Sequence, residues 1–390
     1  MPSDDRQSVG RLQQAIEESD FAWSLCLIGE DQSHKLAALA DDLRGGPSNT
    51  GDGKQITSGF AYWGIAPTVA WAHACNDPYY PVMQQSIESF PQRWRRVRAK
   101  LAEMPYHYVS LGVGTGSKDR QILHDLLTAN PDLLYMPVDM SAEMLRLGMR
   151  ESLKGVSIPR RQMVPVQLDF AIEENLVELR RLLEAVVGAE PILFSLLGNT
   201  MANFDDDVRL LGLLTRLLRP QDRFLLEVAT TDELNDDLAA GAAEEYERSR
   251  AYGEFVTSAL MHYTDLTINM DNVVYRGSVE GDRALRVKII YQNRTGGDLR
   301  FMLPDRTRVT FPDRDTIRLY LTRKYARRGL DGMLDSLGVR KLHGMHSGLA
   351  AHRSAQPFGM NLLLFATGET TAARPPQTSR AEEIWSSYRT

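Results

Sequence analysis

The segment from Tyr108 to Leu123 decides the fold of this chain. It reads Tyr-Val-Ser-Leu-Gly-Val-Gly-Thr-Gly-Ser-Lys-Asp-Arg-Gln-Ile-Leu. An apolar run leads into three glycines at alternate positions, and apolar residues at helical spacing follow, which predicts a strand, a tight turn and a helix. Glycine suits the turn because a side chain would keep the backbone away from a ligand, and the new helix offers free N–H groups to a polar or anionic group. We therefore expect a nucleotide-type site here.

The spacing of the glycines distinguishes three classes of ligand. A phosphate-binding P-loop requires glycine at position 117 and Ser or Thr at 119, where this chain has Ser117 and Asp119. A dinucleotide turn that begins at Gly112 requires a third glycine at position 117 as well. The form Gly-x-Gly-x-Gly, made by Gly112, Gly114 and Gly116, instead resembles the first motif of methyltransferases that use S-adenosylmethionine (SAM). A glycine turn that serves only packing is the alternative.

A carboxylate follows at a distance that suits a ribose. The second predicted strand, 133–139, ends on Asp139, about twenty residues after the last glycine, where a ribose-binding carboxylate is placed in nucleotide sites. Asp139 is therefore the expected ribose ligand, and Ser141 is the expected cap of the next helix. A single Asp after a strand often serves only as a cap, so its position relative to the glycines carries this prediction.

Strands and helices continue to alternate after this point. Further strands are predicted at 163–170, 191–199 and 224–228, with an amphipathic helix over 207–219. This alternation predicts an α/β fold with a doubly wound parallel sheet that binds its ligand at the carboxyl ends of the strands. Asp169 and Phe170, at the end of the third strand, are placed to bind the adenine amino group and to stack on its ring.

The remainder of the chain predicts a second domain. From about residue 255 the pattern has period two, in 285–291, 308–311 and 316–322, which indicates an antiparallel addition, and a last buried strand is expected at 358–365. The many aromatic residues of 58–81 predict a cap over a substrate, or alternatively a small satellite core. We expect four parts: a helical cap over 1–100 that belongs to the substrate domain, a SAM-binding domain over 101–240 and 355–368, a β-rich insertion over 241–354, and a tail over 369–390.

Composition excludes several kinds of partner. The net charge is −6, which argues against nucleic acid because phosphate binding needs clustered Lys and Arg, and the basic cluster Arg93–Arg98 is interpreted as a solvated helix face. Cys26 and Cys75 lack the spacing of metal ligands, so no metal is expected and a reducing, cytoplasmic location is predicted. Neither a signal peptide nor a membrane span is predicted. The oligomeric state stays open.

Four motifs resemble one known family. The segment Leu197–Phe204, with the sequence Leu-Gly-Asn-Thr-Met-Ala-Asn-Phe, resembles the Gly-Ser-Thr-Ile-Gly-Asn-Phe segment of the histidine-specific N-methyltransferase family of ergothioneine biosynthesis. Three other segments are similar to motifs of that family: Gly112–Arg120, Asp77–Pro81 (its Glu-Tyr-Tyr-Pro) and Thr322–Tyr325 (its Ser-Arg-Lys-Phe). The resemblance implies a class I methyltransferase sheet with a second α+β domain, SAM as the cofactor and a small-molecule substrate.

The resemblance also implies roles for individual residues. The implied SAM ligands are Gly112, Gly114, Gly116, Lys118, Asp139, Asp169, Phe170 and Gly198. The implied substrate contacts are Tyr80, Asn203, Tyr320 and Thr322. Glu227, at the carboxyl end of the fifth strand, is the expected general base, with Tyr80 as a second catalytic candidate. A surface or helix-capping role is the alternative for Glu227.

The chain departs from the family at one position that matters for the substrate. Where the family has a substrate-binding glutamate, two residues before its Ser-Arg-Lys-Phe motif, this chain has Tyr320. The exchange removes an acceptor for a cationic or N–H-bearing group, a loss of about 1–3 kcal/mol when the site is buried. Histidine is therefore not the expected substrate. The family's tyrosine after the fifth strand also has no evident counterpart in 244–250.

The sequence leaves three functions open. The first is SAM-dependent methyl transfer to nitrogen, or to oxygen, of an amino acid or small metabolite, in amino-acid or secondary metabolism. The second keeps SAM but not methyl transfer: the amine of SAM attacks its own side chain, closes azetidine-2-carboxylate and releases methylthioadenosine. The third is a non-catalytic SAM-binding protein. Methyl transfer is the leading hypothesis, and the non-catalytic protein is less expected because the ligand motifs look complete.

Overall fold

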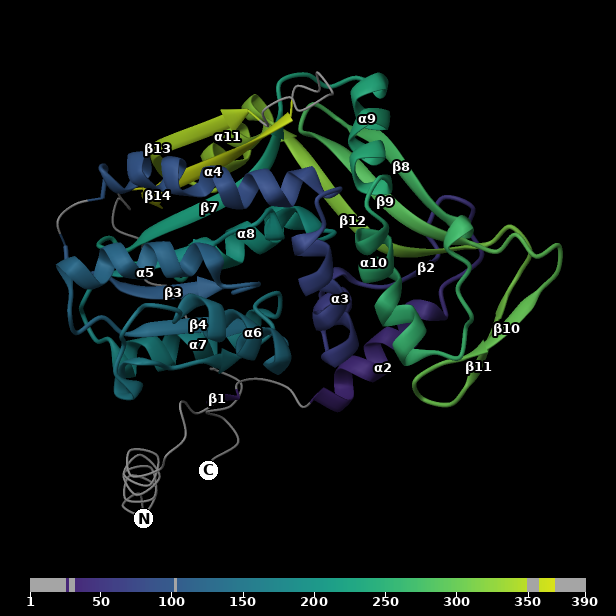
Figure 1. Ribbon diagram of the computed structural model, residues 1–390, viewed down its shortest axis with the longest axis horizontal. Helices are drawn as coiled ribbons and strands as arrows, with labels where there is room; N and C mark the ends of the chain where they lie inside the picture. Colours follow the sequence, from purple (N-terminus) through teal and green to yellow (C-terminus); the bar gives the residue numbers. More distant parts are fainter. Residues whose placement is uncertain (1–25, 28–31, 102–103, 349–357, 369–390) are drawn as a thin grey trace, which may run out of the picture.

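A computed structural model describes residues 26–27, 32–101, 104–348 and 358–368. Its strands are β1 (Cys26–Leu27), β2 (Lys54–Gln55), β3 (His107–Leu111), β4 (Tyr135–Asp139), β5 (Val166–Gln167), β6 (Ile192–Leu196), β7 (Arg223–Thr231), β8 (Val273–Glu280), β9 (Ala284–Gln292), β10 (Leu299–Met302), β11 (Arg308–Phe311), β12 (Thr316–Ala326), β13 (Val339–Gly348) and β14 (Phe358–Thr367). Twelve of these form one sheet, whose main path runs β1-β5-β4-β3-β6-β7-β12-β9-β8 (Figure 1).

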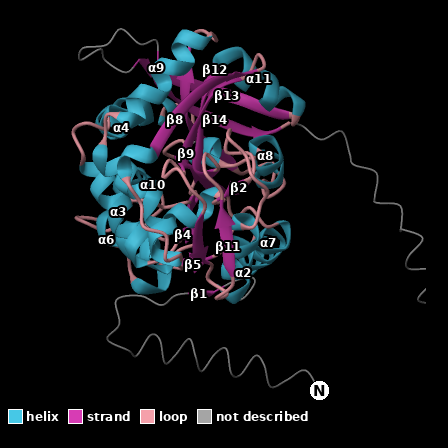
Figure 2. Cartoon of the chain, turned by 90° about the vertical axis from the view of Figure 1, so that its right-hand side faces the viewer, coloured by secondary structure: helices cyan, strands magenta, loops and turns pink. Residues whose placement is uncertain are grey.

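Helices cover both faces of the parallel half of this sheet. The α-helices are α2 (Gln32–Leu43), α3 (Ile65–Asn76), α4 (Pro81–Arg98), α5 (Ser117–Ala129), α6 (Ala142–Ser152), α7 (Glu173–Val186), α8 (Asp207–Thr215), α9 (Asp236–Glu247), α10 (Arg250–Tyr263) and α11 (Arg327–Ser336). Apolar side chains of α4 and α5 pack on one face, and those of α7, α8 and α11 pack on the other. Figure 2 shows the strands between these two layers. The expected α/β, doubly wound class is confirmed.

The strand directions follow from the β/α alternation of the sequence. Strands β5, β4, β3, β6 and β7 are parallel neighbours in that order, because a helix returns the chain to the same edge between successive strands. Strand β14 lies antiparallel beside β7, and β13 pairs antiparallel with β14. The carboxyl ends of the parallel strands, and the turns that follow them, therefore meet along one edge.

The second half of the sheet is mainly antiparallel. Strand β12 continues from the end of β7 through the pairs Tyr325–Thr230 and Ala326–Thr231, and then pairs with β9, which pairs with β8. Strand β2 adds to β12, and β10 and β11 form a separate hairpin that projects from this half (Figure 1). A third apolar core joins this half to α3, α9 and α10. The two halves of the molecule thus share one continuous sheet.

Three expectations differ from the structure. Residues 339–348, expected in the insertion over 241–354, form β13 beside β14. Helix α4, expected in the cap over 1–100, packs on the sheet with α5. Arg93 and Trp94 are buried, so the segment Arg93–Arg98 is not simply a solvated face. The other domain boundaries remain predictions, and the expected tail over 369–390 lies outside the described residues. In the described part of the chain, no helix combines the length and apolarity that crossing a bilayer requires.

Candidate functional site

The glycine turn has the backbone conformation that its sequence predicts. Gly112, Gly114 and Gly116 all have positive φ, and Gly116 leads directly into α5. A Cβ atom on Gly116 would lie 2.0 Å from the carbonyl oxygen of Gly148 on α6. Glycine at 116 is therefore required both by the left-handed backbone and by the close approach of α6.

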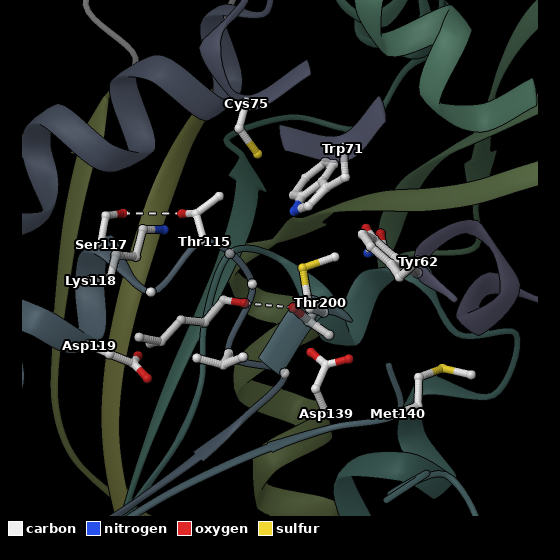
Figure 3. A pocket seen from close by; sticks show the side chains of 18 of the residues that line it. Tyr62, Trp71, Cys75, Thr115, Ser117, Lys118, Asp119, Asp139, Met140 and Thr200 are labelled. Atoms are coloured by element: carbon white, nitrogen blue, oxygen red, sulfur yellow. Dashed lines mark hydrogen bonds between the residues drawn. The ribbon is translucent and has the colours of Figure 1, made fainter. Parts of the chain in front are cut away.

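A pocket opens above this turn at the carboxyl ends of β3, β4, β5 and β6. It encloses about 970 Å³ including its open mouth, within the range of small-molecule sites. All eight residues expected to bind SAM line it: Gly112, Gly114, Gly116, Lys118, Asp139, Asp169, Phe170 and Gly198. Tyr62 of η1 (Ser58–Tyr62) and Trp71 and Cys75 of α3 form the opposite wall (Figure 3). We refer to this pocket as the SAM pocket.

Asp139 is buried at the end of β4 and faces the SAM pocket (Figure 3). Its Oδ1 atom accepts a hydrogen bond of 3.0 Å from the backbone N–H of Ser141, whose own side chain caps α6. Burial raises the pKa of Asp139 to about 7. The carboxyl group therefore lies near its midpoint of ionisation at neutral pH, and a ligand that donates hydrogen bonds favours the ionised form.

Asp169 and Phe170 lie beside Asp139 in the same pocket. Phe170 packs against Phe204 with ring centroids 6.0 Å apart. Lys35 of α2 donates to Asp169 Oδ2 at 3.0 Å, while Asp169 Oδ1 accepts from the backbone N–H of Ala171. The position suits an adenine ring, although Asp169 already has two hydrogen-bond donors.

Lys118 belongs to a buried cluster of charges that the sequence did not reveal. Lys118 and Arg93 both donate to the carboxylate of Glu227, Arg93 at 2.5 Å. The side chains of Arg93 and Glu227 are completely buried. The backbone N–H of Gly198 donates to Glu227 Oε2 at 2.8 Å.

These contacts argue against Glu227 as the general base. Burial alone would raise the pKa of Glu227, but Lys118 and Arg93 outweigh it and hold the pKa below its usual value. Glu227 also lines neither the SAM pocket nor the cavity beside it. A carboxylate held ionised between two cations is a poor proton acceptor.

A smaller cavity of about 370 Å³ adjoins the SAM pocket. Five residues line both: Tyr62, Trp71, Met83, Gly198 and Asn203. The expected substrate residues Tyr80, Asn203, Tyr320 and Thr322 all line this cavity. We refer to it as the aromatic cavity, because its rings are those of Tyr62, Trp71, Tyr80, Tyr246, Tyr252 and Tyr320.

The lining of the aromatic cavity is neutral. Among the described residues, it contains no Asp, Glu, Lys, Arg or His side chain. Burial raises the pKa of Tyr62, Tyr80, Tyr252 and Tyr320, so these phenols remain protonated near neutral pH. The hydroxyl groups of Tyr62 and Tyr320 hydrogen-bond to each other, and Asn203 Nδ2 lies 3.4 Å from the Tyr62 oxygen.

Two polar atoms in this lining are buried and lack a hydrogen-bond partner among the described residues, namely Trp71 Nε1 and Tyr252 Oη. Asn199 and Thr322, in contrast, are paired, because Asn199 Nδ2 donates a hydrogen bond of 3.2 Å to Thr322 Oγ1. Because buried polar groups are rarely left unpaired, Trp71 and Tyr252 indicate where a ligand supplies hydrogen-bonding groups.

Sequence reasoning missed several residues of this site. Tyr246 and Tyr252 come from α9 and α10, in and beside the segment 244–250 that offered no evident counterpart of the family's tyrosine. Tyr62 and Trp71 belong to the aromatic-rich stretch that predicted a cap, but their individual positions were not foreseen. Nothing in the sequence distinguished Arg93 from the other arginines of α4.

The chain matches the profile of the family described as histidine-specific methyltransferase, SAM-dependent, over residues 66–348. Three solved structures are similar at low identity. A SAM-dependent methyltransferase from Clostridium acetobutylicum has 13% identity and a TM-score of 0.34, with 73% of this chain and 92% of that chain covered. The CcbJ methyltransferase from Streptomyces caelestis has 15% identity and a TM-score of 0.34, with 82% of this chain and 99% of that chain covered. Magnesium protoporphyrin IX methyltransferase from Synechocystis has 10% identity and a TM-score of 0.38, with 79% of this chain and 96% of that chain covered. No curated protein matches significantly.

Proposed function

Because the chain belongs to the family of histidine-specific, SAM-dependent methyltransferases, we propose that it methylates a nitrogen atom of an amino acid or small metabolite other than histidine. The protein is a SAM-dependent methyltransferase, and SAM is its cofactor. The observation that carries the proposal about the acceptor is the neutral aromatic cavity, which shares five residues with the SAM pocket.

The SAM pocket fits this cofactor on two structural grounds. A Cβ atom would meet no other atom within 4 Å at Gly198, and only the Gly112 carbonyl oxygen at 4.0 Å at Gly114, so glycine at these two pocket-lining positions leaves space that a side chain would occupy. Asp139 offers a carboxylate to the ribose, and Lys118 offers a positive charge to the methionine carboxylate, from different parts of the pocket (Figure 3). We propose Asp169, Phe170 and Gly198 as further ligands, as the resemblance implies.

Bound SAM supplies an electrophilic methyl group on a sulfonium. The residues of the aromatic cavity exclude water and orient the acceptor, which is the main contribution required for this chemistry. A neutral, buried surrounding lowers the pKa of an amine, so the acceptor nitrogen keeps its lone pair without a dedicated base. The site therefore does not need Glu227 as a proton acceptor.

The same lining supports an acceptor different from histidine. Tyr320 is neutral and already hydrogen-bonded to Tyr62, so it offers no carboxylate to a cationic imidazole. Trp71 Nε1 and Tyr252 Oη can donate to an acidic group, and an amino acid supplies one through its carboxylate. Aromatic rings on most sides favour an aromatic or otherwise neutral side chain.

One observation supports a second candidate function. Tyr62 and Tyr320 both line the aromatic cavity, and the hydrogen bond between them holds two of its rings together, which limits the space for a separate acceptor. In that case the protein would convert SAM into azetidine-2-carboxylate, methylthioadenosine and a proton, with one C–N bond formed and one C–S bond broken. We keep this reaction as the alternative.

A product assay distinguishes these functions. Purified protein is incubated with SAM alone, with histidine, and with a panel of other amino acids and small amines, and S-adenosylhomocysteine and methylthioadenosine are quantified by mass spectrometry. We expect S-adenosylhomocysteine only with a non-histidine acceptor. Methylthioadenosine from SAM alone would establish the alternative, and efficient methylation of histidine would show that Tyr320 does not control specificity.

The variant Tyr320→Glu extends the assay. It restores a carboxylate where the family has one, so we expect lower turnover of the native acceptor and, at most, weak activity on histidine. Tyr320→Phe is the matched control, because it removes the hydroxyl group without adding charge. Both variants losing activity equally would point to the lost hydrogen bond with Tyr62 and not to the introduced charge.

A further inference from the structure

Arg93 and Glu227 form a buried charge cluster with Lys118 at one end of the SAM pocket. Arg93 extends from α4, Lys118 from the first turn of α5, and Glu227 from β7. Of these three residues, only Lys118 lines the SAM pocket, and Figure 3 shows it on the side of the pocket away from Met140. The other two charges lie behind it, and their side chains are fully buried.

The charges within this cluster do not cancel, because two cations share one carboxylate. Among the described residues, Glu227 is the only acid within ion-pair distance of Arg93 or Lys118, and Asp119 attracts Lys118 only from a longer distance. An unbalanced buried charge is unfavourable unless an anion joins it. Lys118 is the member that a ligand can reach, so the excess positive charge is directed at the SAM pocket. The carboxylate of the methionine part is the anionic group that SAM carries.

Hydrogen bonds fix the geometry of the cluster. Ser86 connects the two cations, since its Oγ accepts from Lys118 at 2.7 Å and its carbonyl oxygen accepts from Arg93 at 2.9 Å. Arg93 also donates to Ser347 Oγ of β13 at 2.8 Å. Glu227 accepts from the backbone N–H of Gly198. The cluster therefore joins α4, α5, β7, β13 and the turn after β6 around one end of the pocket.

We propose that Arg93 and Glu227 are positioning residues for the methionine carboxylate of SAM. Glu227 holds the ammonium group of Lys118 and the Gly198 turn in place, and Arg93 neutralises Glu227 so that Lys118 keeps an available positive charge. This rests on the proposed function only through the binding of SAM, and it does not depend on the identity of the acceptor.

Calorimetry with two ligands tests the proposal. S-adenosylhomocysteine carries the amino-acid part, whereas methylthioadenosine lacks it and binds only through the adenosine part. In Arg93→Met the remaining pair is neutral, so we expect the affinity for S-adenosylhomocysteine to fall by about tenfold or more, the usual size for one charge-assisted contact. The affinity for methylthioadenosine should not change. Arg98→Met is the matched control on the same helix, where Arg98 pairs with Asp125 at the surface, and it should leave both affinities unchanged.

Equal losses for both ligands in Arg93→Met would reduce Arg93 to a structural role, and no loss for either would also overturn the proposal.

If Arg93→Met does not fold, Glu227→Gln provides an isosteric second test. The charged or titratable groups around Lys118 are Arg93 on α4, Glu227 on β7, Cys75 on α3 and the adjacent Asp119. Burial and Arg93 lower the pKa of Lys118, whereas Glu227 raises it, so Glu227→Gln should lower this pKa further. Lys118 then loses its charge as pH rises, and the affinity of Glu227→Gln for S-adenosylhomocysteine should fall, whereas its affinity for methylthioadenosine should not. A flat profile would contradict the proposal.

The two proposals can fail separately. A wild-type protein that binds S-adenosylhomocysteine, responds to Arg93→Met as expected and turns over no acceptor would refute the proposed methyl transfer alone. Methyl transfer to a non-histidine acceptor with unchanged ligand affinities in Arg93→Met and a flat profile in Glu227→Gln would refute only the role of the cluster.

Discussion

At the scale of single residues, burial changes what the acidic groups of the SAM pocket can do. Asp139 and Asp119 are both buried, and burial raises their pKa values to about 7 and about 6. Glu227 is equally buried, but its two cationic partners hold its pKa below the usual value. Acidic residues therefore provide a carboxyl group that titrates near neutral pH in the lining of the pocket and a permanent anion behind Lys118.

Asp139 gives a prediction about pH. Below its pKa the carboxyl group is protonated and loses acceptor capacity toward the ribose hydroxyls, and above its pKa it is ionised. We therefore expect the affinity for S-adenosylhomocysteine to rise from about pH 6 to about pH 8, with proton release on binding. Calorimetry in buffers of different ionisation enthalpy measures both.

Two variants of Asp139 complete the test. Asp139→Ala should weaken binding by about 1.5–3 kcal/mol near pH 8, the usual size for charge-assisted hydrogen bonds. Asp139→Asn should remove the pH dependence while it preserves the shape of the side chain. Unchanged affinity in a folded Asp139→Ala protein would show that Asp139 is not the ribose ligand.

At the scale of elements, helix α5 both lines the SAM pocket and is anchored to the sheet. Lys118, in its first turn, faces the cluster with Glu227, and Asp119 beside it accepts hydrogen bonds from Tyr108 of β3 at 3.0 Å and Tyr135 of β4 at 2.7 Å. The turn formed by the glycines is therefore held from the helix side as well as by its own backbone. The position of the SAM pocket depends on this anchor.

Asp119 predicts a pH dependence of stability. Its folded pKa of about 6 lies above the reference value of 3.8, so its stabilising contribution is complete below about pH 4 and is lost as pH rises through about 6. The free energy of unfolding of the ligand-free wild type should fall by about 1–2 kcal/mol more than that of Asp119→Asn between about pH 5 and about pH 7.5. Guanidinium unfolding at these pH values measures the difference. Parallel curves for the two proteins would contradict this account of Asp119.

At the scale of the whole molecule, a buried ion pair lies where the two halves of the sheet meet. Lys324 of β12 lies 2.7 Å from Glu245 of α9, and the Lys324 side chain is fully buried. Its ammonium group lies over the rings of Tyr246, in the aromatic cavity, and Phe358 of β14. Lys324 therefore contacts both α9, in the antiparallel half, and β14, which lies beside the parallel strands.

Lys324→Met should destabilise the protein by about 3–5 kcal/mol, because Glu245 is left as an unpaired buried charge. The double variant Lys324→Met with Glu245→Gln should be less destabilised than the sum of the single variants, and a double-mutant cycle on denaturant unfolding measures this coupling. The exposed pair Arg250 and Glu254 on α10 is the control, where Arg250→Met should change stability by less than about 1 kcal/mol. Additive effects at Lys324 and Glu245 would show that the two buried groups do not stabilise each other.

The sequence by itself determined the α/β class, the glycine turn and the family. These features are local: positive φ at Gly112, Gly114 and Gly116 follows from residue type, and strand–helix alternation follows from short-range periodicity. The sequence also identified a set of residues that the fold brings to one pocket, because the ends of parallel strands meet at one edge. The roles of these residues remain predictions.

Only the tertiary structure decided the surroundings of the charges and the shape of the acceptor cavity. Arg93 and Glu227 are 134 residues apart in the chain, so no local pattern shows that one neutralises the other, and the sequence assigned a solvated face to one and a base to the other. The aromatic cavity likewise collects tyrosines from η1, α9, α10 and β12. Burial and charge pairing are properties of the packed chain, and they fix the pKa values and the neutral lining on which the proposed choice of substrate rests.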